Sequence, residues 1–450
     1  MVKSKSGPVL YLASVLSLLL YIFIAYVVKR HDSFLLLTCY TLLFTAFLTM
    51  WYYAYSSKRV RWLVVLAIFL RVSLLLAFPN LSDDIYRFVW DGRLINNDIH
   101  PFSYLPTYFM SPGSPDVPGI TSSLFYQLNS PEYFTIYPPV SQFFFSVSAS
   151  IFPESVHGSA IVMRIFIIVA EIGSIWLITR ILFHYKLPSR HVLLYALNPL
   201  IILELTGNLH FEAFMIFFLL VAVYFFLTRR YIISALAFAF TIASKLLPLI
   251  FLPLLVRRIW GKQVMVYYVL TAIFTLILFL PLINQELING MSSSLSLYFQ
   301  RFEFNASIYY LLREGGFYLK GYNTIHILGK YLAASTFILI MGYALLHNPR
   351  RVKLPEAMLW VILIYCMLTT TLHPWYLATV VLLSVFTPFR FPALWSFLVF
   401  VTYVGYSETG FQENLILTTI EYILVYTCML YEIYIHYIRS TNKKVVEVYE

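Results

Sequence analysis

The chain has 450 residues, of which 60% are hydrophobic and only 12% charged, and its mean hydropathy is +0.78. A soluble domain of this length carries far fewer apolar residues, so the composition predicts an integral membrane protein in contact with lipid. The net charge of +10 could attract nucleic acid, but Lys and Arg are dispersed at the ends of apolar segments, where they orient membrane spans. We therefore expect no nucleic-acid partner.

Continuous apolar runs indicate the fold class. Runs of about 17 to 25 residues, the length that crosses the hydrocarbon core as a helix, recur roughly eleven to thirteen times. Only helices or closed barrels satisfy every backbone group in lipid, and these runs do not alternate as barrel strands do. The sequence predicts one all-α membrane helix bundle over residues 1–450. Its first spans are expected at 9–28, 34–53 and 62–78.

A long polar segment, 79–137, follows the third span. It contains six prolines between positions 101 and 131, and aromatic residues are spread through it, which argues against disorder. A connection this long inside a compact bundle is usually functional. The basic turn before position 62 is expected in the cytoplasm, which makes 79–137 an outward-facing loop. Lys29 and Arg30 lie on the wrong side under this orientation.

The beginning of that loop combines acids and bases. Asp83, Arg87 and Asp91 are four residues apart, so a helix would place them on one face, beside Asp84 and Arg93. A carboxylate here could serve as a general base toward a hydroxyl, and a cation could accompany a phosphate leaving group. The acidic pair could also bind Mg²⁺ or Mn²⁺. The alternative is a solvated amphipathic helix on the membrane surface.

Two apolar segments are interrupted. Segment 138–152, which begins with two prolines after Tyr137, has only 15 residues and several Ser, so we expect it to be re-entrant or interfacial. Segment 231–256 is flanked by basic residues on both sides, and we expect a broken hairpin with its break near Lys245 and Pro248. Arg257-Arg258 and Arg350-Arg351 would then lie in the cytoplasm.

Lys245 stands alone in an apolar segment, where an isolated charge is usually functional. We assign it to an anionic phosphate. The alternative is an ion pair with Glu204 or Glu171. Arg71 and Glu171, both within expected spans, could form a structural pair.

Further polar candidates lie at segment ends. Asn208, His210 and Glu212 could supply a base or hold a ligand, or could simply cap helices. A second outward loop is expected at 284–323. The candidates there and beyond, suited to phosphate, hydroxyl or sugar contacts, are Arg301, Glu303, His373, Trp375 and Tyr376.

These motifs, in this order, resemble those of the GT-C membrane glycosyltransferases. They run from Ser82-Asp83-Asp84 and Tyr137-Pro138-Pro139 through Asn208–Glu212 and Ser244-Lys245 to His373-Pro374-Trp375-Tyr376. The nearest resemblance is to the bacterial polyprenyl-phosphate-mannose-dependent mannosyltransferases, and a more distant one is to the first GPI mannosyltransferase. It covers roughly residues 61–376.

The resemblance implies an inverting transfer of a sugar, commonly mannose, from a polyprenyl phosphate donor to a hydroxyl of a lipid or glycan acceptor. The active site would face outward from a bacterial plasma membrane. By position, Asp83 or Asp84 would be the base or the acid that binds the acceptor. From their charge and placement, we infer that Lys245, Arg87 and His373 are on the phosphate side. Because the acids are adjacent rather than Asp-x-Asp, metal dependence stays open. The alternatives are a flippase or transporter of lipid-linked sugars, which would place charges at mid-membrane, and a glycan polymerase.

Overall fold

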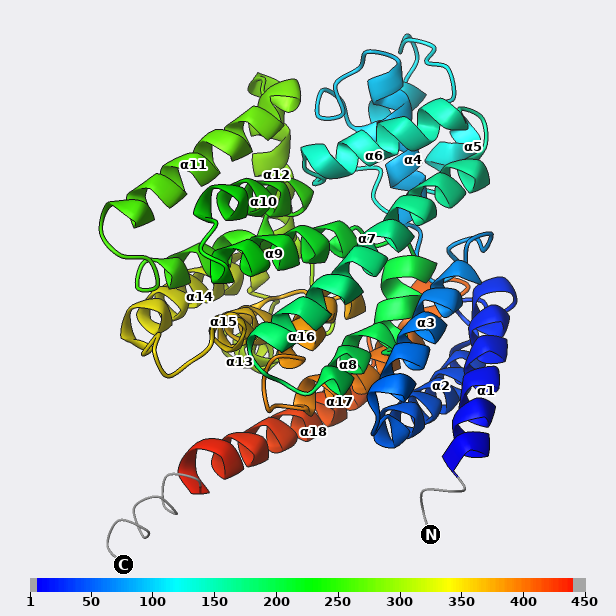
Figure 1. Cartoon of the computed structure of the whole chain (residues 1–450). Coiled ribbons are helices and arrows are strands. Elements are labelled where there is room, and N and C mark those ends of the chain that lie inside the picture. Colours follow the sequence, from blue (N-terminus) through cyan, green and yellow to red (C-terminus); the bar gives the residue numbers. More distant parts are fainter. Residues whose placement is uncertain (1–5, 440–450) are drawn as a thin grey trace, which may run out of the picture.

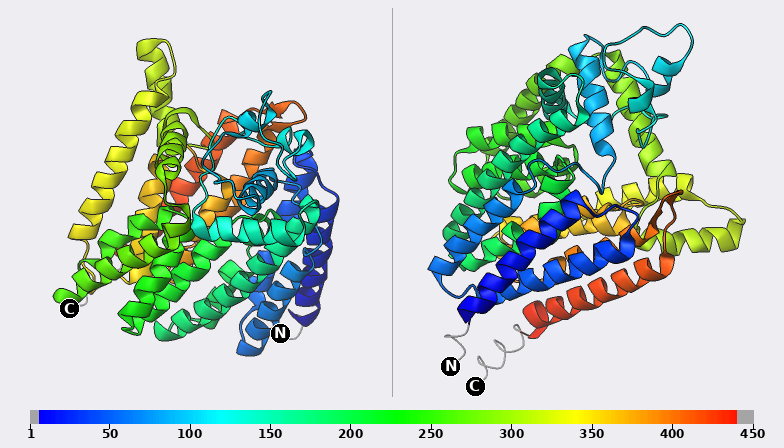
Figure 2. Two further views of the ribbon diagram at one scale, coloured as in Figure 1. Left: turned by 90° about the horizontal axis from the view of Figure 1, so that it is seen from above. Right: turned by 90° about the vertical axis from the view of Figure 1, so that its right-hand side faces the viewer.

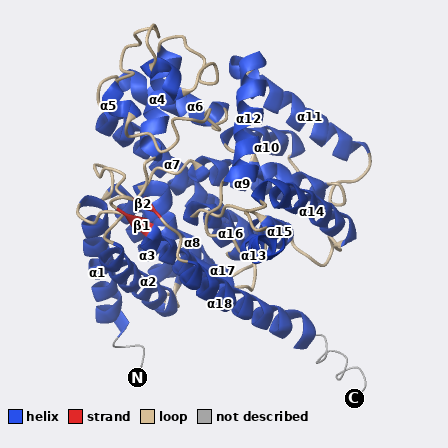
Figure 3. Cartoon of the chain, turned by 180° about the vertical axis from the view of Figure 1, so that it is seen from behind, coloured by secondary structure: helices blue, strands red, loops and turns tan. Residues whose placement is uncertain are grey.

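The computed structural model describes residues 6–439, and almost all of its regular structure is helical (Figure 3). The all-α prediction is confirmed. The strands of the described part are β1 (Tyr406–Ser407) and β2 (Gly410–Phe411), which form one antiparallel pair.

Among the described residues, six helices are long and apolar enough to cross a membrane. They are α1 (Ser6–Tyr26), α2 (Ser33–Tyr53), α7 (Val156–His184), α11 (Lys262–Phe279), α14 (Ile325–Leu346) and α18 (Leu415–Ile433). The π-helix η3 (Ile201–Gly207) and α9 (Glu212–Leu227) would make a seventh span, bent by 110°. These helices suggest a multi-pass membrane protein. By length and composition, fewer described helices qualify than the eleven to thirteen that the apolar runs predict.

The difference arises because several apolar runs fold as shorter helices. One example is segment 231–256, where the predicted break at Lys245 is confirmed. There α10 (Tyr231–Ser244) ends, Lys245 is extended, and the 3-10 helix η4 (Leu247–Leu255) follows, with Pro248 in its first turn and Pro253 inside it. Proline removes a backbone donor and prevents a continuous α-helix. Similar short helices are α15 (Leu354–Leu368), η6 (Pro374–Tyr376) with α16 (Leu377–Ser384), and α17 (Phe391–Leu398) with η7 (Val399–Gly405).

The segment 79–151 forms a helical cap at the end of the molecule opposite the two chain termini (Figures 1 and 2). Its elements are α4 (Asp84–Asn96), η1 (Pro106–Met110), α5 (Ser122–Phe125) and α6 (Pro139–Ile151). A 13-residue helix such as α6 is about 20 Å long, less than the roughly 30 Å hydrocarbon core. This length agrees with the expectation that 138–152 does not cross.

The segment 284–323, expected as a second outward loop, is mostly helical. It contains α12 (Gln285–Arg301) and α13 (Ile308–Lys320). The Asn284 side chain caps α12 by accepting a hydrogen bond from the Leu287 amide at 2.8 Å. Between the two helices, Phe304 pairs through its backbone with Thr370 and Leu372. This pairing brings segment 302–304 beside segment 370–376.

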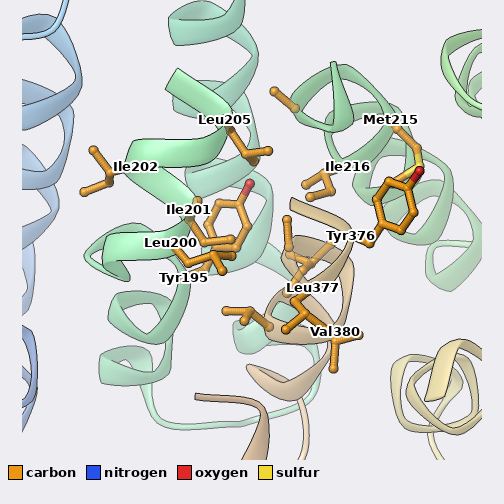
Figure 4. Close-up of a cluster of buried hydrophobic side chains, with 14 of the residues drawn as sticks. Tyr195, Leu200, Ile201, Ile202, Leu205, Met215, Ile216, Tyr376, Leu377 and Val380 are labelled. Carbon is orange, nitrogen blue, oxygen red and sulfur yellow. The ribbon is translucent and has the colours of Figure 1, made fainter. Parts of the chain in front are cut away.

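Buried polar contacts connect the helices beneath the cap. Arg71 of α3 (Ser57–Val72) and Glu171 of α7 form a fully buried ion pair at 2.9 Å, and the Tyr195 hydroxyl donates to the same carboxylate. The expected structural pair is confirmed. Figure 4 shows the neighbouring apolar cluster, in which Ile201 and Leu205 of η3 pack near residues of α9 and α16. The remaining elements are η2 (Ser189–Val192), α8 (Leu193–Ala196), η5 (Leu280–Leu282) and η8 (Tyr434–Arg439).

Candidate active site

A cleft of about 430 Å³ lies where the cap meets the rest of the bundle. Its walls come from the start of α4, from segment 129–137, from segments 302–304 and 371–376, and from the β1–β2 hairpin. Many of the predicted site residues line it: Asp83, Asp84, Arg87, Tyr137, Lys245, Glu303, His373, Trp375 and Tyr376. The fold thus gathers residues that are far apart in the sequence into one polar and aromatic cavity.

The two adjacent carboxylates have different partners. Asp83 Oδ2 lies 2.6 Å from a guanidinium nitrogen of Arg30, and that guanidinium also stacks 4.5 Å above the Tyr406 ring. The Asp83 side chain is 38% exposed, whereas that of Asp84 is 17% exposed. Arg30 therefore neutralises Asp83 at the rim of the cleft.

Asp84 is held by neutral donors and a histidine. It accepts hydrogen bonds from the Asn129 amide at 2.9 Å and from the Tyr137 hydroxyl at 3.4 Å, and its Oδ2 lies 3.8 Å from His210 Nδ1. Burial raises the pKa of Asp84 above its ordinary value, although His210 and Asn129 oppose the shift. A carboxylate with a raised pKa in a cleft has the properties of a general base.

Arg87 and Asp91, which the four-residue spacing places on one helix face, form an ion pair, whereas Asp83 precedes α4 and pairs with Arg30. Arg87 Nε is 2.9 Å from Asp91 Oδ1, and Arg87 also donates to the Tyr133 carbonyl. Asp91 is fully buried and accepts a hydrogen bond from Gln142 of α6. Arg87 lines the cleft, whereas Asp91 lies behind it and joins α4 to α6. Arg93 also lies away from the cleft and donates to the Gly119 carbonyl.

Asn208, His210 and Glu212 are buried behind the cleft wall at the bend between η3 and α9. Leu209 has a φ of 63°, and this left-handed residue helps the chain turn sharply there. Asn208 donates to Glu204 at 2.9 Å, and Tyr403 donates to the other oxygen of Glu204 at 2.8 Å. These contacts hold Glu204 with its Oε2 3.2 Å from His210 Nε2.

Lys245 projects into the cleft from the break after α10. It pairs with Glu212, and its ammonium lies 4.5 Å above the Tyr376 ring. The alternative partners Glu204 and Glu171 are wrong. Glu204 is held by Asn208 and Tyr403, and Glu171 is engaged by Arg71.

Three stacked rings form one wall. The Trp375 ring lies 4.4 Å from that of His373 on one side and 3.8 Å from that of His210 on the other. His373 Nδ1 is buried and has no hydrogen-bond partner among the described residues. Burial, with the nearby His210 and Lys245, lowers the pKa of His373 to about 3, so its ring is neutral at physiological pH.

The last two predicted residues differ in their position. Arg301, at the end of α12, is exposed and does not line the cleft. Glu303 lines it, pairs with Arg313 at 3.1 Å and accepts a hydrogen bond from the Tyr309 hydroxyl.

Sequence reasoning missed several lining residues, notably Arg30, Asn129, Tyr406 and Phe411. A signal for Arg30 was present, because its charge conflicts with the expected orientation of the spans. The other three lie outside any motif, and only the folded chain brings them to the cleft.

The donor set does not suit a metal held by the acidic pair. Within residues 6–439, no group of three or more His, Cys, Asp or Glu side chains is arranged as a metal site. Asp83 faces a guanidinium, and Asp84 faces an amide and a phenol. We therefore derive no step through a metal ion.

One comparison with known proteins gives a match. Residues 6–261 match the family described as alpha-(1->6)-mannopyranosyltransferase, N-terminal domain, of the MptA/B group. No curated protein matches the chain. The matched part contains Asp83, Asp84, His210 and Lys245, while the wall formed by segments 302–304 and 371–376 lies beyond it.

Proposed function

The chain belongs to the MptA/B family of alpha-(1->6)-mannopyranosyltransferases, and from this premise we propose that it transfers mannose from a polyprenyl phosphate mannose donor to a hydroxyl of a lipid or glycan acceptor. The family makes the protein a mannosyltransferase, which implies a mannose donor and an acceptor. The linkage in the family description points to a primary 6-hydroxyl as the attacking group. The candidate membrane spans support a donor that is itself dissolved in the bilayer.

We assign the general base to Asp84. The acceptor oxygen attacks C1 of mannose from the face opposite the phosphate, and its proton passes to Asp84. The bond between C1 and the phosphate oxygen breaks, and the electron pair leaves with the polyprenyl phosphate. The configuration at C1 inverts, so an α-linked product requires a β-linked donor. The observation that carries this assignment is that Asp84 faces neutral donors, whereas Arg30 neutralises Asp83.

We place the donor phosphate between Lys245 and His373. The Lys245 ammonium lines the cleft 4.5 Å above the Tyr376 ring, where a donor phosphate would share it with Glu212, and an ammonium is an effective point-charge partner for phosphate. The unpaired Nδ1 of neutral His373 would donate a hydrogen bond to a phosphate oxygen in one tautomer. The negative charge that develops on the leaving phosphate would thus lie beside the Lys245 ammonium and the N–H group of His373.

The aromatic wall suits the sugar. Trp375 is stacked between His373 and His210, so both faces of its ring are covered, but its edge and the neighbouring Tyr376 still give the cleft an aromatic surface suited to contacts with a hexose. We move Arg87 from the expected phosphate side to the acceptor side, because it lines the cleft next to Asp84 while Asp91 fixes its position.

We further propose that the cleft faces outward from a bacterial plasma membrane. One wall of the cleft is the start of α4. This helix belongs to the cap, which lies at the end of the molecule opposite the start of α1 and the end of α18 (Figure 1). The arginines expected in the cytoplasm do not line the cleft. Arg257 and Arg258 donate hydrogen bonds to backbone carbonyls of segment 345–352, which also contains Arg350 and Arg351. This clustering of basic residues away from the cleft supports the orientation.

The test is transfer of labelled mannose by the purified protein in liposomes, with polyprenyl phosphate glucose and arabinose as competing donors. Asp84→Asn should lower the rate by roughly 10²- to 10⁴-fold, because the base is lost. Asp83→Asn, the matched control, should keep most activity. An active Asp84→Asn variant would refute the base assignment. Labelled lipid that crosses the bilayer without transfer would favour the flippase instead.

A further inference from the structure

Asn305 fastens one wall of the cleft to the candidate span α18. Its backbone amide donates to both carboxylate oxygens of Glu413, at 2.9 and 3.1 Å, and its carbonyl accepts a hydrogen bond from the Tyr422 hydroxyl at 2.6 Å. Its side-chain Nδ2 donates to Glu421 Oε1 at 3.2 Å. Asn305 is fully buried and has a φ of 43°, in the left-handed region that asparagine tolerates better than most residues. The chain is thus held at this point through both its backbone and its side chain.

The residue before Asn305 connects this anchor to the proposed phosphate site. Phe304 pairs through its backbone with Thr370 and Leu372, and its ring lies 4.6 Å from the ring of His373. Phe304 and His373 both line the cleft. A displacement of Asn305 would therefore move Phe304 and weaken the packing that supports His373, the side chain that we place beside the donor phosphate.

Two buried oxygen atoms of the contact between Asn305 and Glu421 have no hydrogen-bond partner among the described residues. They are Asn305 Oδ1 and Glu421 Oε2. The other oxygen of Glu421 accepts from Asn305 Nδ2 and, at 2.8 Å, from the indole N–H of Trp395 in α17. Leaving a buried acceptor unpaired is costly. A protonated carboxyl group would satisfy both atoms at once, because its O–H is a donor and the amide oxygen is an acceptor.

The surroundings of Glu421 provide no compensating positive charge. In the described part of the chain, the titratable groups that face it are Glu413, Tyr422 and Tyr426, and each of these is either neutral or negative. Glu421 is 1% exposed and lies within the candidate span of α18. A carboxylate without a cation is expensive in such a place, whereas a hydrogen-bonded neutral carboxyl is not.

We propose that Glu421 is a positioning residue that keeps its proton and forms a paired acid–amide contact with Asn305. In this pair, Asn305 Nδ2 donates to Oε1 of Glu421, and the O–H on Oε2 of Glu421 donates to Asn305 Oδ1. The pair fixes Asn305 and thereby keeps Phe304 against His373. Glu421 itself does not line the cleft. The effect of the pair on transfer rests on the proposed function, whereas the protonation of Glu421 does not.

The test compares two replacements of Glu421 that have nearly the same size. Glu421→Gln keeps both hydrogen bonds, because its amide nitrogen donates to Asn305 Oδ1 in place of the carboxyl O–H. We expect its rate of mannose transfer from polyprenyl phosphate mannose to stay within about threefold of that of the unsubstituted protein. Such a rescue by glutamine distinguishes a neutral pair from an ionised carboxylate.

Glu421→Met removes both hydrogen bonds and leaves the Asn305 amide and the Trp395 indole without their acceptor. Its kcat should fall at least about tenfold, because a small displacement of groups around the reacting centre lowers the rate steeply. Ile420→Met, at an exposed position of the same helix, is the matched control and should keep full activity. A fully active Glu421→Met variant would overturn the inference, as would a Glu421→Gln variant no more active than Glu421→Met.

Infrared difference spectroscopy measures the protonation of Glu421 without a transfer assay. The spectrum of the unsubstituted protein minus that of Glu421→Gln, in detergent at neutral pH, should contain the C=O stretch of a protonated carboxyl group. A carboxylate band in its place would overturn the inference. If Glu421→Met does not fold, this spectrum and the activity of Glu421→Gln decide the question. An unsubstituted protein that shows the carboxyl band but transfers no mannose would refute the proposed function and leave the protonated pair in place.

Discussion

Asp83 and Asp84 are neighbours in the chain, yet their surroundings give them different chemistry. The Arg30 guanidinium compensates the charge of Asp83, while Asp84 is mostly buried and meets an amide, a phenol and an imidazole. A base must be unprotonated to act, so activity that depends on Asp84 should fall as the pH falls through its pKa. Because burial raises that pKa, the loss should begin at a higher pH than for an ordinary aspartate.

The Asn129 amide provides a test of this pH dependence. It donates to Asp84 Oδ1 and thereby favours the charged carboxylate. In Asn129→Ala the pKa of Asp84 should rise further, so the acidic limb of the kcat/KM profile should move to higher pH. The measurement is transfer rate against pH for the two proteins. Gln127→Ala, an exposed amide in the same segment that bonds only to the Ser123 carbonyl, should leave the profile unchanged. An unshifted profile for Asn129→Ala would argue against Asp84 as the titrating group.

At the scale of elements, the cap depends on the close packing of α4 on α6. A Cβ added at Gly92 would lie 2.3 Å from the Phe145 backbone carbonyl oxygen, a distance that no side chain tolerates without movement of a helix. The same interface carries the hydrogen bond between Gln142 and Asp91, which positions Arg87. The position of the acidic residues therefore depends on one glycine.

We expect Gly92→Ala to separate the two helices. The free energy of unfolding should fall by about 1–3 kcal/mol, which is typical of overpacking. The transfer rate should fall at least tenfold. Thermal unfolding in detergent and transfer assays measure the two effects. The matched control is Gly342→Ala in α14, where an added Cβ meets nothing within 4 Å and where alanine favours the helix. A Gly92→Ala protein as stable and active as the control would show that the α4–α6 contact can relax.

The guanidinium of Arg164 in α7 links two segments of the chain. It donates to the carbonyls of Leu75 and Ala77, just before the acidic segment, and to those of Thr206 and Gly207, at the bend that carries His210. One buried side chain thus satisfies the backbone at two breaks in the spans, as the low-polarity interior requires. It also fixes the distance between the two segments that meet at Asp84.

For the whole molecule, the proposed orientation places the cap outside and the arginine-rich turns inside. We expect an impermeant thiol reagent added to intact cells to label Ser122→Cys in α5, but to label Arg350→Cys only after the membrane is permeabilised. Both positions are exposed, and the native Cys39 and Cys366 are buried, so replacing Cys428 with Ser removes the main background. Labelling of Arg350→Cys alone in intact cells would reverse the orientation and place the cleft in the cytoplasm.

The sequence alone determined the class of the protein and part of its site. Continuous hydropathy and the four-residue spacing of Asp83, Arg87 and Asp91 are local properties, so the all-α membrane fold and the Arg87–Asp91 pair could be predicted. The break at Lys245 was predictable for the same reason, because proline acts on its own helix. The number of spans was not, since a run of apolar residues does not reveal where tertiary packing ends a helix.

Only the tertiary structure decided which carboxylate is paired with a guanidinium and what surrounds the other. Arg30, Asn129 and Tyr406 come from three distant segments, and no local pattern connects them with Asp83 or Asp84. Likewise, Lys245 pairs with Glu212 because the bend at Leu209 carries that residue to the break after α10. Partner choice depends on distance in space, and in a chain of this length that distance is set by how the spans pack and not by their order in the sequence.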